Sequence, residues 1–194
     1  YNFGQKKFFR TRTLEAHCRQ PAIVGRVISL IYSNYRYSGG AHGNYNFHTY
    51  VFTLDPLARV YPISQIFSDA NESFSKIQRL AREQLINDLS AADGLPPEDH
   101  REWVNGGTEK WSDFEAFALA EGGIEIIFPP YQVAAYAYGP QTVILDKNDI
   151  HDLLRPEFLS ALGWENLRWQ SEHQTMLSEM PTNVAADVAT VEKQ

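Results

Sequence analysis

Three small groups of side chains in this sequence could take part in catalysis. His42 stands among glycines in the segment GGAHG, which reverses the order of the HGGG oxyanion loop of esterases. Cys18 follows His17, so a thiol and a candidate base are neighbours. Glu125 and Asp113 are acids of the type that cleave glycosidic bonds in pairs. The sequence has no GxSxG motif, no known motif surrounds the cysteine, and a carboxylate separation is not encoded in linear order, so we expect no catalytic residue.

A metal site would have to rely on histidines and carboxylates, because the chain has a single cysteine. His42, His48 and Glu125 are the residues from which such a site could be imagined. Two histidines six positions apart on one strand lie well apart, and their spacing matches no common ligand pattern. We therefore expect neither a metal nor another cofactor.

The tyrosines gather in two short windows that could bind a partner. Eight of the ten lie within residues 32–50 and 131–138. The first window surrounds the GGAHG loop, and the second belongs to the segment PPYQVAAYAYG, whose prolines restrict the backbone before the rings. Rigid amphipathic rings are typical of protein-binding surfaces. We predict partner contacts by Tyr37, His42, Tyr45, Tyr131 and Tyr136, and loop shaping by Gly39, Gly40, Gly43, Pro129, Pro130 and Gly139.

The same residues also fit a purely structural role. A glycine-rich hairpin needs its glycines to turn, and His42 can hydrogen-bond a neighbouring loop to fix its shape. Tyrosines can cover the edge of a core while their hydroxyls bond to the backbone. A surface shared by both windows requires the two loops to lie at the same end of the sheet.

Strands and one long helix must position these loops. Residues 23–37 and 43–54 are rich in β-branched and aromatic residues and predict a hairpin, with a short third strand after Asp55 and Pro56. Residues 68–90 repeat apolar side chains at steps of three and four, which predicts a helix. Side chains alternate along a strand, so one face of the second strand should point to the core and carry Tyr45, Phe47, Thr49 and Val51.

The second half of the chain predicts a further hairpin and short helices. Residues 92–111 are rich in turn formers and charges and are interpreted as a surface excursion. A strand, a turn at Gly122 and Gly123 and a second strand follow, then the Pro-Tyr loop, a final strand at 141–146 and short helices broken at Pro156. The expected fold is α+β, with a mainly antiparallel sheet of hairpins packed against one long helix plus short C-terminal helices.

The length and net charge of the chain limit the number of domains and the kinds of partner that we expect. With 194 residues, of which 43% are hydrophobic, we expect one compact domain, followed by a flexible tail at residues 169–194, which are small and polar without a sustained period. No window is apolar for long enough to span a bilayer. A net charge of −7 without clustered Lys and Arg argues against nucleic acid and favours a basic partner.

The segments YSGGAHGNYNFHTYVFTLD and FALAEGGIEIIFPPYQVAAYAYGPQTVIL, with a helix between them, resemble the RsiV C-terminal-like domain, a bacterial domain of unknown function. The resemblance spans about residues 23–162. It implies that residues 23–168 form the α+β domain and that residues 1–22 are the remnant of a preceding segment or domain. It implies an extracytoplasmic α+β domain, as in a lysozyme-binding anti-sigma factor and beside peptidoglycan deacetylases. The paired aspartates of those deacetylases are missing, since TLDPL at 53–57 does not supply them. The resemblance thus implies recognition in the periplasm or cell envelope, by a protein whose anchor would lie outside this segment.

The expected function is that of a non-catalytic recognition or sensor domain that binds an envelope protein such as a basic lysozyme. The alternative is a module that binds peptidoglycan or another cell-wall glycan, with tyrosine rings stacked on the sugars. A hydrolase acting on that glycan is a third reading, which a carboxylate and His42 in one cleft would favour.

Overall fold

The computed structural model describes residues 4–5 and 12–165, and its strands form two antiparallel sheets. The first sheet has the order β1-β3-β4-β5, with β2 also paired to β3, and the second has the order β6-β7-β8. The strands are β1 (Thr13–Cys18), β2 (Ala22–Val24), β3 (Val27–Tyr37), β4 (Asn44–Leu54), β5 (Leu57–Arg59), β6 (Phe117–Ala120), β7 (Gly123–Phe128) and β8 (Gln141–Asp146).

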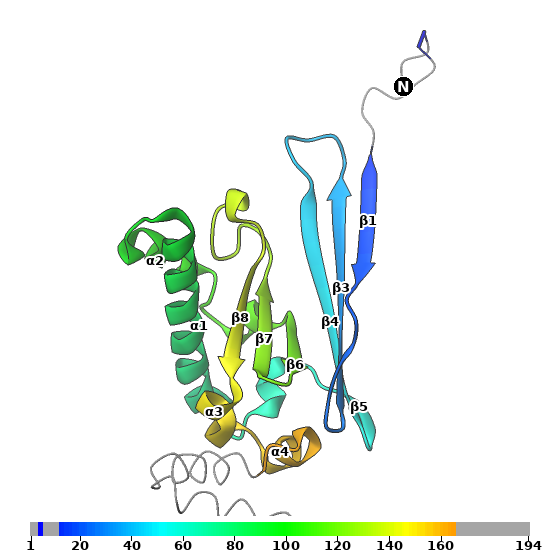
Figure 1. The fold of residues 1–194 in the computed structure, drawn as a ribbon, viewed down its shortest axis with the longest axis vertical. Coiled ribbons are helices and arrows are strands. Elements are labelled where there is room, and N and C mark those ends of the chain that lie inside the picture. Colours follow the sequence, from blue (N-terminus) through cyan, green and yellow to red (C-terminus); the bar gives the residue numbers. More distant parts are fainter. Residues whose placement is uncertain (1–3, 6–11, 166–194) are drawn as a thin grey trace, which may run out of the picture.

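The helices lie mainly around the second sheet. Figure 1 shows this sheet between α1 and the first sheet, with α2 at the same end as the β3–β4 hairpin and with α3 and α4 at the opposite end. The α+β class is confirmed. The α-helices are α1 (Ala70–Asp93), α2 (Pro97–Gly106), α3 (Lys147–Ile150) and α4 (Pro156–Leu162), and the 3-10 helices are η1 (Ile63–Ile66), η2 (Trp111–Phe114), η3 (Tyr136–Tyr138) and η4 (His151–Leu153).

Helix α1 forms where the apolar period predicts it. The Asp69 side chain accepts hydrogen bonds from the backbone N–H groups of Asn71 and Glu72, which satisfies two donors at the helix start. The helix ends at Gly94, whose φ of 75° is the left-handed conformation that glycine adopts most readily. One stripe of the helix is buried and forms part of the main core: Ile77, Ala81, Leu85 and Leu89.

Residues 92–111 do not form the predicted surface excursion, because they contain α2. Pro97 occupies the first turn, where a missing N–H has no cost, and Glu98 and Asp99 lie at the positive end of the helix dipole. The helix packs on α1 and buries Val104 completely. The sequence did not predict this helix, because it has only two buried residues, His100 and Val104, and they are too few to produce an apolar period among its charges and turn formers.

The long first strand of the sequence prediction is divided in two. Gly25 has a φ of 54°, and the chain reverses there so that β2 and β3 pair as a hairpin with Val24 opposite Val27. A Cβ atom at this glycine would overlap the carbonyl oxygen of Ala161, so α4 packs directly on the turn. The expectation of one continuous strand over 23–37 is therefore wrong.

Residues 1–22 contain a strand of the same sheet. β1 pairs with β3 along its whole length, from Thr13 opposite Tyr37 to Cys18 opposite Tyr32. The predicted tail at 169–194 lies outside the described residues. Over the residues that the structure does describe, no helix is both long and apolar enough to cross a membrane.

Two buried or half-buried hydroxyl groups join the sheets. Ser29 on β3 accepts a hydrogen bond from the N–H of Leu119 and donates one to its carbonyl oxygen. Thr49 on β4 accepts from the N–H of Phe117 and donates to the carbonyl oxygen of Glu115. Since β6 pairs only with β7, these hydroxyls satisfy its outer edge and place that edge on the face of the first sheet. As predicted, Thr49 shares this face with buried Val51.

Candidate functional site

The GGAHG loop and the 129–139 loop meet at one end of the molecule. The rings of His42 and Tyr136 are stacked, with 3.8 Å between centroids and 22° between planes. His42 Nε2 lies 3.0 Å from the Tyr131 hydroxyl, and its Nδ1 lies 3.0 Å from the carbonyl oxygen of Gly43. The Tyr136 hydroxyl donates to that same carbonyl oxygen at 2.8 Å. The structure therefore brings three of the five predicted contact residues together. We call His42, Tyr131 and Tyr136 the loop cluster.

Tyr131 holds a conformation that is unusual for a bulky residue. Its φ of 73° lies in the left-handed region, which a side chain disfavours, yet its ring is 51% exposed. The neighbouring Gln132 fixes the backbone here, since its side-chain amide donates to the carbonyl oxygens of Gly107 and Asp113. Such local strain is found where the surroundings hold a residue in place, and it is concentrated at ligand-binding positions.

The remaining predicted tyrosines lie on the adjoining face of β3 and β4. Tyr45 is 40% exposed and packs on Tyr35 with 4.9 Å between ring centroids. The Tyr136 ring lies 5.5 Å from the Tyr131 ring between centroids. Partial burial, followed by the proximity of Tyr35, Tyr45 and Tyr131, raises the pKa of Tyr136. The Tyr37 hydroxyl instead donates to the carbonyl oxygen of Gly40 within its own loop.

The predicted loop-shaping residues act in different ways. Gly39 and Gly139 have φ values of 101° and 69° and so use the conformational freedom of glycine. Gly43 has no such angle, but a Cβ atom there would overlap the Tyr35 ring, so its role is close packing. Gly40 has neither constraint. Pro129 accepts a backbone hydrogen bond from Gln132, and Pro130 is half-buried.

The far end of the 129–139 loop is tied to the junction of α1 and α2. The Tyr138 hydroxyl donates to the carboxylate of Asp93, which also accepts from the N–H of Leu95 at 2.9 Å. Buried His100 lies beside them, with Nε2 3.4 Å from an Asp93 oxygen. The hydrogen bond from Tyr138, and then that from Leu95, lower the pKa of Asp93 below its ordinary value of 3.8.

Replacing Asp93 by asparagine should destabilise the protein at neutral pH and have a smaller effect in acid. A carboxyl whose pKa is lowered by folding stabilises the folded state above its unfolded value, here 3.8, and this contribution disappears as the pH falls through the lower folded value. Urea denaturation between pH 7 and pH 3 measures the difference from the wild type. Asp88→Asn, on the exposed face of the same helix, is the control. If Asp93→Asn lowered the free energy of unfolding by the same amount at pH 7 and at pH 3, a lowered pKa of Asp93 would be contradicted.

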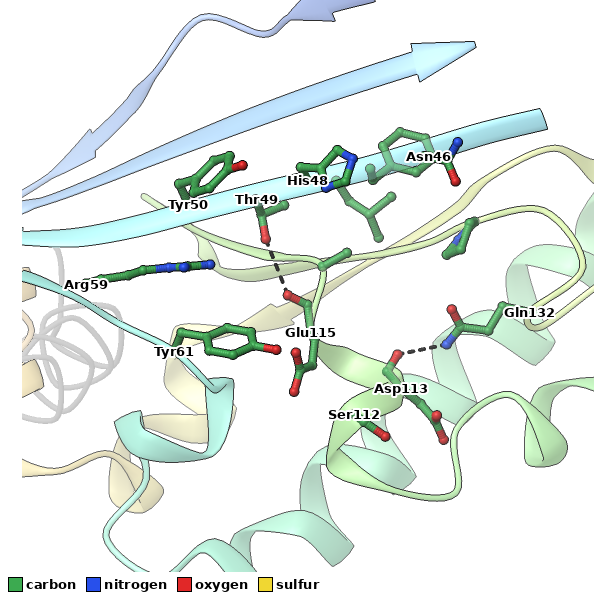
Figure 2. A pocket seen from close by; sticks show the side chains of 14 residues that line it. Asn46, His48, Thr49, Tyr50, Arg59, Tyr61, Ser112, Asp113, Glu115 and Gln132 are labelled. Atoms are coloured by element: carbon green, nitrogen blue, oxygen red, sulfur yellow. Dashed lines mark hydrogen bonds between the residues drawn. The ribbon is translucent and has the colours of Figure 1, made fainter. Parts of the chain in front are cut away.

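A cleft of about 410 Å³ opens beside the unpaired part of β4. Figure 2 shows its walls, which come from β4, from the end of β5 and the chain after it, and from the segments around η2 and Gln132. Pro129 and Gln132 line it, and Tyr131 stands between them in sequence, so the cleft adjoins the loop cluster. Its lining combines aromatic rings, amides, hydroxyls and one guanidinium group: Asn46, Phe47, His48, Thr49, Tyr50, Arg59, Tyr61, Ser112, Asp113, Glu115, Ala116, Ile127, Pro129 and Gln132.

The Tyr61 hydroxyl and the Glu115 carboxylate point toward each other in the cleft, as Figure 2 shows. A hydrogen bond to Glu115, strengthened by its negative charge, raises the pKa of the Tyr61 hydroxyl. The carboxylate of Glu115 is thereby oriented at one wall of the cleft, as Figure 2 shows. Neutral groups of a bound molecule, such as hydroxyls or amide N–H groups, could donate to its remaining lone pairs.

Asp113 and His48 both line the cleft, but Glu125 does not, and the described residues include no group of three or more histidines, cysteines and acids that could hold a metal. Glu125 pairs with Arg19 through two hydrogen bonds, one of 2.8 Å. The Asp113 carboxylate accepts from the backbone N–H groups of Glu109 and Lys110. His48 lies near Tyr32, away from the His42 cluster. These side chains therefore have structural partners of their own.

Sequence reasoning missed the cleft residues. Tyr50 was counted in a tyrosine window, but Arg59, Tyr61 and Glu115 belong to segments interpreted only as strand or turn. The alternation of side chains on β4 was a usable signal for one wall. The other walls come from Arg59 and Tyr61, which follow β4 closely, and from segments around Ser112 and Gln132, which are more than fifty positions away and which no local pattern connects to β4.

Comparison with known proteins gives sequence similarity to one family over part of the chain and to part of one longer relative, and structural similarity to two solved proteins. Residues 64–148 match the family model described as "Protein of unknown function (DUF3298)". The chain is 29% identical over 164 residues to the peptidoglycan-N-acetylmuramic acid deacetylase PdaC of Bacillus subtilis strain 168. The aligned region covers 84% of this chain and 33% of that relative. The chain thus spans about a third of the length of this relative.

Two solved structures have the same fold. A DUF3298 family member from Bacteroides fragilis NCTC 9343 aligns with a TM-score of 0.54 and 20% identity, over 78% of this chain and 56% of its own. A DUF3298 family protein from Pseudomonas aeruginosa PAO1 aligns with a TM-score of 0.56 and 16% identity, over 75% of this chain and 62% of its own. The chain therefore shares its fold with DUF3298 proteins and is similar in sequence to that family over residues 64–148.

Proposed function

We propose that this domain is a non-catalytic recognition domain of the cell envelope that binds a protein through the joined His42 and Tyr131 loops. The observation that supports it most is Tyr131, an exposed ring held in a left-handed conformation and hydrogen-bonded to His42. A ring fixed before binding loses little conformational entropy on contact, which is why such residues contribute strongly to binding.

Charge and similarity agree with an envelope setting and a basic partner. The net charge of −7 favours association with a basic protein, such as a lysozyme, at a rate that falls as salt screens the attraction. The similarity to a peptidoglycan deacetylase favours an extracytoplasmic location. The resemblance to RsiV C-terminal-like domains fits the same setting.

Titration calorimetry with a basic lysozyme tests this proposal. We expect binding that weakens as salt rises, and we expect Tyr131→Ala to weaken it by about 2 kcal/mol, or roughly thirtyfold, as for a binding hot spot. His42→Ala should weaken it less, because it removes only the support of the ring. The free energy of unfolding should change by about 0.5 kcal/mol or less for Tyr131→Ala, since its ring is half exposed.

Tyr32→Ala is the matched control, because Tyr32 is also exposed but lies on the opposite face of β3 from Tyr35. It should leave binding unchanged. An equal loss for both variants, or a large loss of stability with Tyr131→Ala, would instead favour a packing role for the loop. No heat with lysozyme at low salt would reject this partner.

Binding of a cell-wall glycan is the second candidate function, and the cleft is the observation that favours it. Tyr50 and Tyr61 give the cleft an aromatic wall, while Asn46 and Ser112 offer polar groups to a sugar. The PdaC relative is named for action on N-acetylmuramic acid in peptidoglycan. Titration with soluble peptidoglycan fragments tests this candidate separately from the loops, and Tyr61→Ala should reduce the affinity.

A further inference from the structure

The cleft in Figure 2 contains one arginine, and that arginine is held between two rings. The Cζ atom of Arg59 lies 5.4 Å from the centroid of the Tyr50 ring and 4.9 Å from that of the Tyr61 ring. Both distances are within the range of cation–π attraction. The two rings restrict the side chain to part of its rotamer range, so its guanidinium group is oriented before any ligand arrives.

The guanidinium group of Arg59 makes no hydrogen bond or ion pair with a residue in the described part of the chain, although its backbone pairs with Phe52 in the sheet. By contrast, Arg19 pairs with Glu125 and Arg79 pairs with Glu83. The planar N–H donors of Arg59 therefore remain available to a bound molecule. Their fork geometry matches the two oxygens of a carboxylate, which can accept two parallel hydrogen bonds.

The acids of the cleft limit which molecules fit beside this arginine. The Glu115 carboxylate points toward the Tyr61 hydroxyl in Figure 2, and the Asp113 carboxylate accepts from two backbone N–H groups. Neither neutralises Arg59, but both would repel a second negative charge. A suitable ligand carries one carboxylate for Arg59 and neutral hydroxyl or amide groups for the rest of the cleft.

We infer that this cleft binds a sugar that carries a carboxylate, and that Arg59 is the residue that binds the carboxylate. This inference rests on the glycan-binding candidate above and names the chemical class of that glycan. N-acetylmuramic acid has this chemistry, because it is an amino sugar with a carboxylate on a lactyl ether. N-acetylglucosamine is the same sugar without that group, which makes the two a matched pair of probes.

NMR titration of the folded protein with each sugar tests the inference. For the wild type we expect about tenfold tighter binding of N-acetylmuramic acid, as a charge-assisted bidentate pair provides, with shifts at residues that line the cleft. Arg59→Gln should abolish the preference while leaving the weak binding of N-acetylglucosamine. Arg59→Lys should keep part of the preference, because it retains the charge but loses the planar fork.

Arg79→Gln is the control, since it makes the same change of charge at an exposed ion pair on α1. It should keep the full preference, and a melting curve of each variant should confirm that the fold is intact. Equal binding of the two sugars by the wild type would overturn the role of Arg59 and leave glycan binding standing. A preference that survives in Arg59→Gln would do the same, whereas binding of neither sugar would reject the glycan-binding candidate together with this inference.

Discussion

Replacing Phe114 by alanine should lower the free energy of unfolding by about 3–5 kcal/mol, the range for truncating a buried phenylalanine. Phe114 is fully buried in the main core. Its ring meets those of Phe74 and Phe128 edge-on, with centroids 5.9 and 5.7 Å away. It thereby connects α1 to β7 beneath the chain that forms one wall of the cleft.

The surroundings of Phe114 should prevent the cavity from closing. The indole N–H of Trp111 donates to the carbonyl oxygen of Ala70 at 3.0 Å, which ties η2 to α1. The Asp113 carboxylate holds the backbone at the start of η2 through two further hydrogen bonds. A segment fixed on both sides relaxes little, so most of the cavity cost should remain.

Urea denaturation measures this effect, with Phe114→Leu and Trp103→Ala as controls. The leucine variant keeps most of the volume and should lose less than the alanine variant. Trp103 is 45% exposed on α2, and its removal should cost about 1 kcal/mol or less. A loss in Phe114→Ala no greater than that in Trp103→Ala would show that the ring is not essential to the core.

Replacing Gly107 by alanine should cost about 2–3 kcal/mol and weaken binding at the Tyr131 loop. The φ of Gly107 is −86°, so alanine is compatible with its backbone conformation. A Cβ atom there would instead overlap the carbonyl oxygen of Gln132. Gln132 directly follows Tyr131, and its side chain donates to the carbonyl oxygen of Gly107 at 2.9 Å. The loop would have to move away and lose this hydrogen bond.

The neighbouring Gly106 is a matched control for Gly107. A Cβ atom there meets nothing within 4 Å, and the residue lies in the last turn of α2. Gly106→Ala should therefore be neutral or slightly stabilising, within about 1 kcal/mol. Chemical denaturation of both variants, together with their affinity for the lysozyme probe, separates the two positions. Similar results for the two alanines would argue against a close contact between α2 and the loop.

The loop cluster and the cleft share one segment, which could couple their functions. Pro129 and Gln132 line the cleft, while Tyr131 between them contacts His42. The proposed protein contact and the proposed sugar site therefore adjoin each other. Variants of Tyr131 and Arg59 test the two surfaces independently, because the side chains belong to different clusters.

Much of the secondary structure was predictable because its signals are local. The apolar period of α1, its cap at Asp69 and the hairpin of β6 and β7 are all encoded within a few successive residues. The same reasoning failed at α2, where two buried residues are too few to produce a period. It also failed at Gly25, where a single glycine divides a run of strand-forming residues.

The candidate site was only partly predictable. Tyrosine clustering pointed to Tyr131, Tyr136 and His42, which the structure brings together across 89 positions of sequence between His42 and Tyr131. Glycine content indicated a shaped loop, but it could not distinguish Gly43, where a Cβ atom would overlap the Tyr35 ring, from Gly40, which has no such neighbour. Arg59 carried no signal, because its two tyrosine neighbours become significant only when their rings stand on either side of it.

Periodicity and turn chemistry between near neighbours specify the long helix, the hairpins and the two tyrosine-rich loops. The folded structure is needed to see that the two loops meet, that Glu125 pairs with Arg19, and that a cleft forms around Arg59, because each of these features is a contact between distant segments. Their proximity depends on how β6 docks through Ser29 and Thr49 onto the first sheet, and no local pattern specifies that docking.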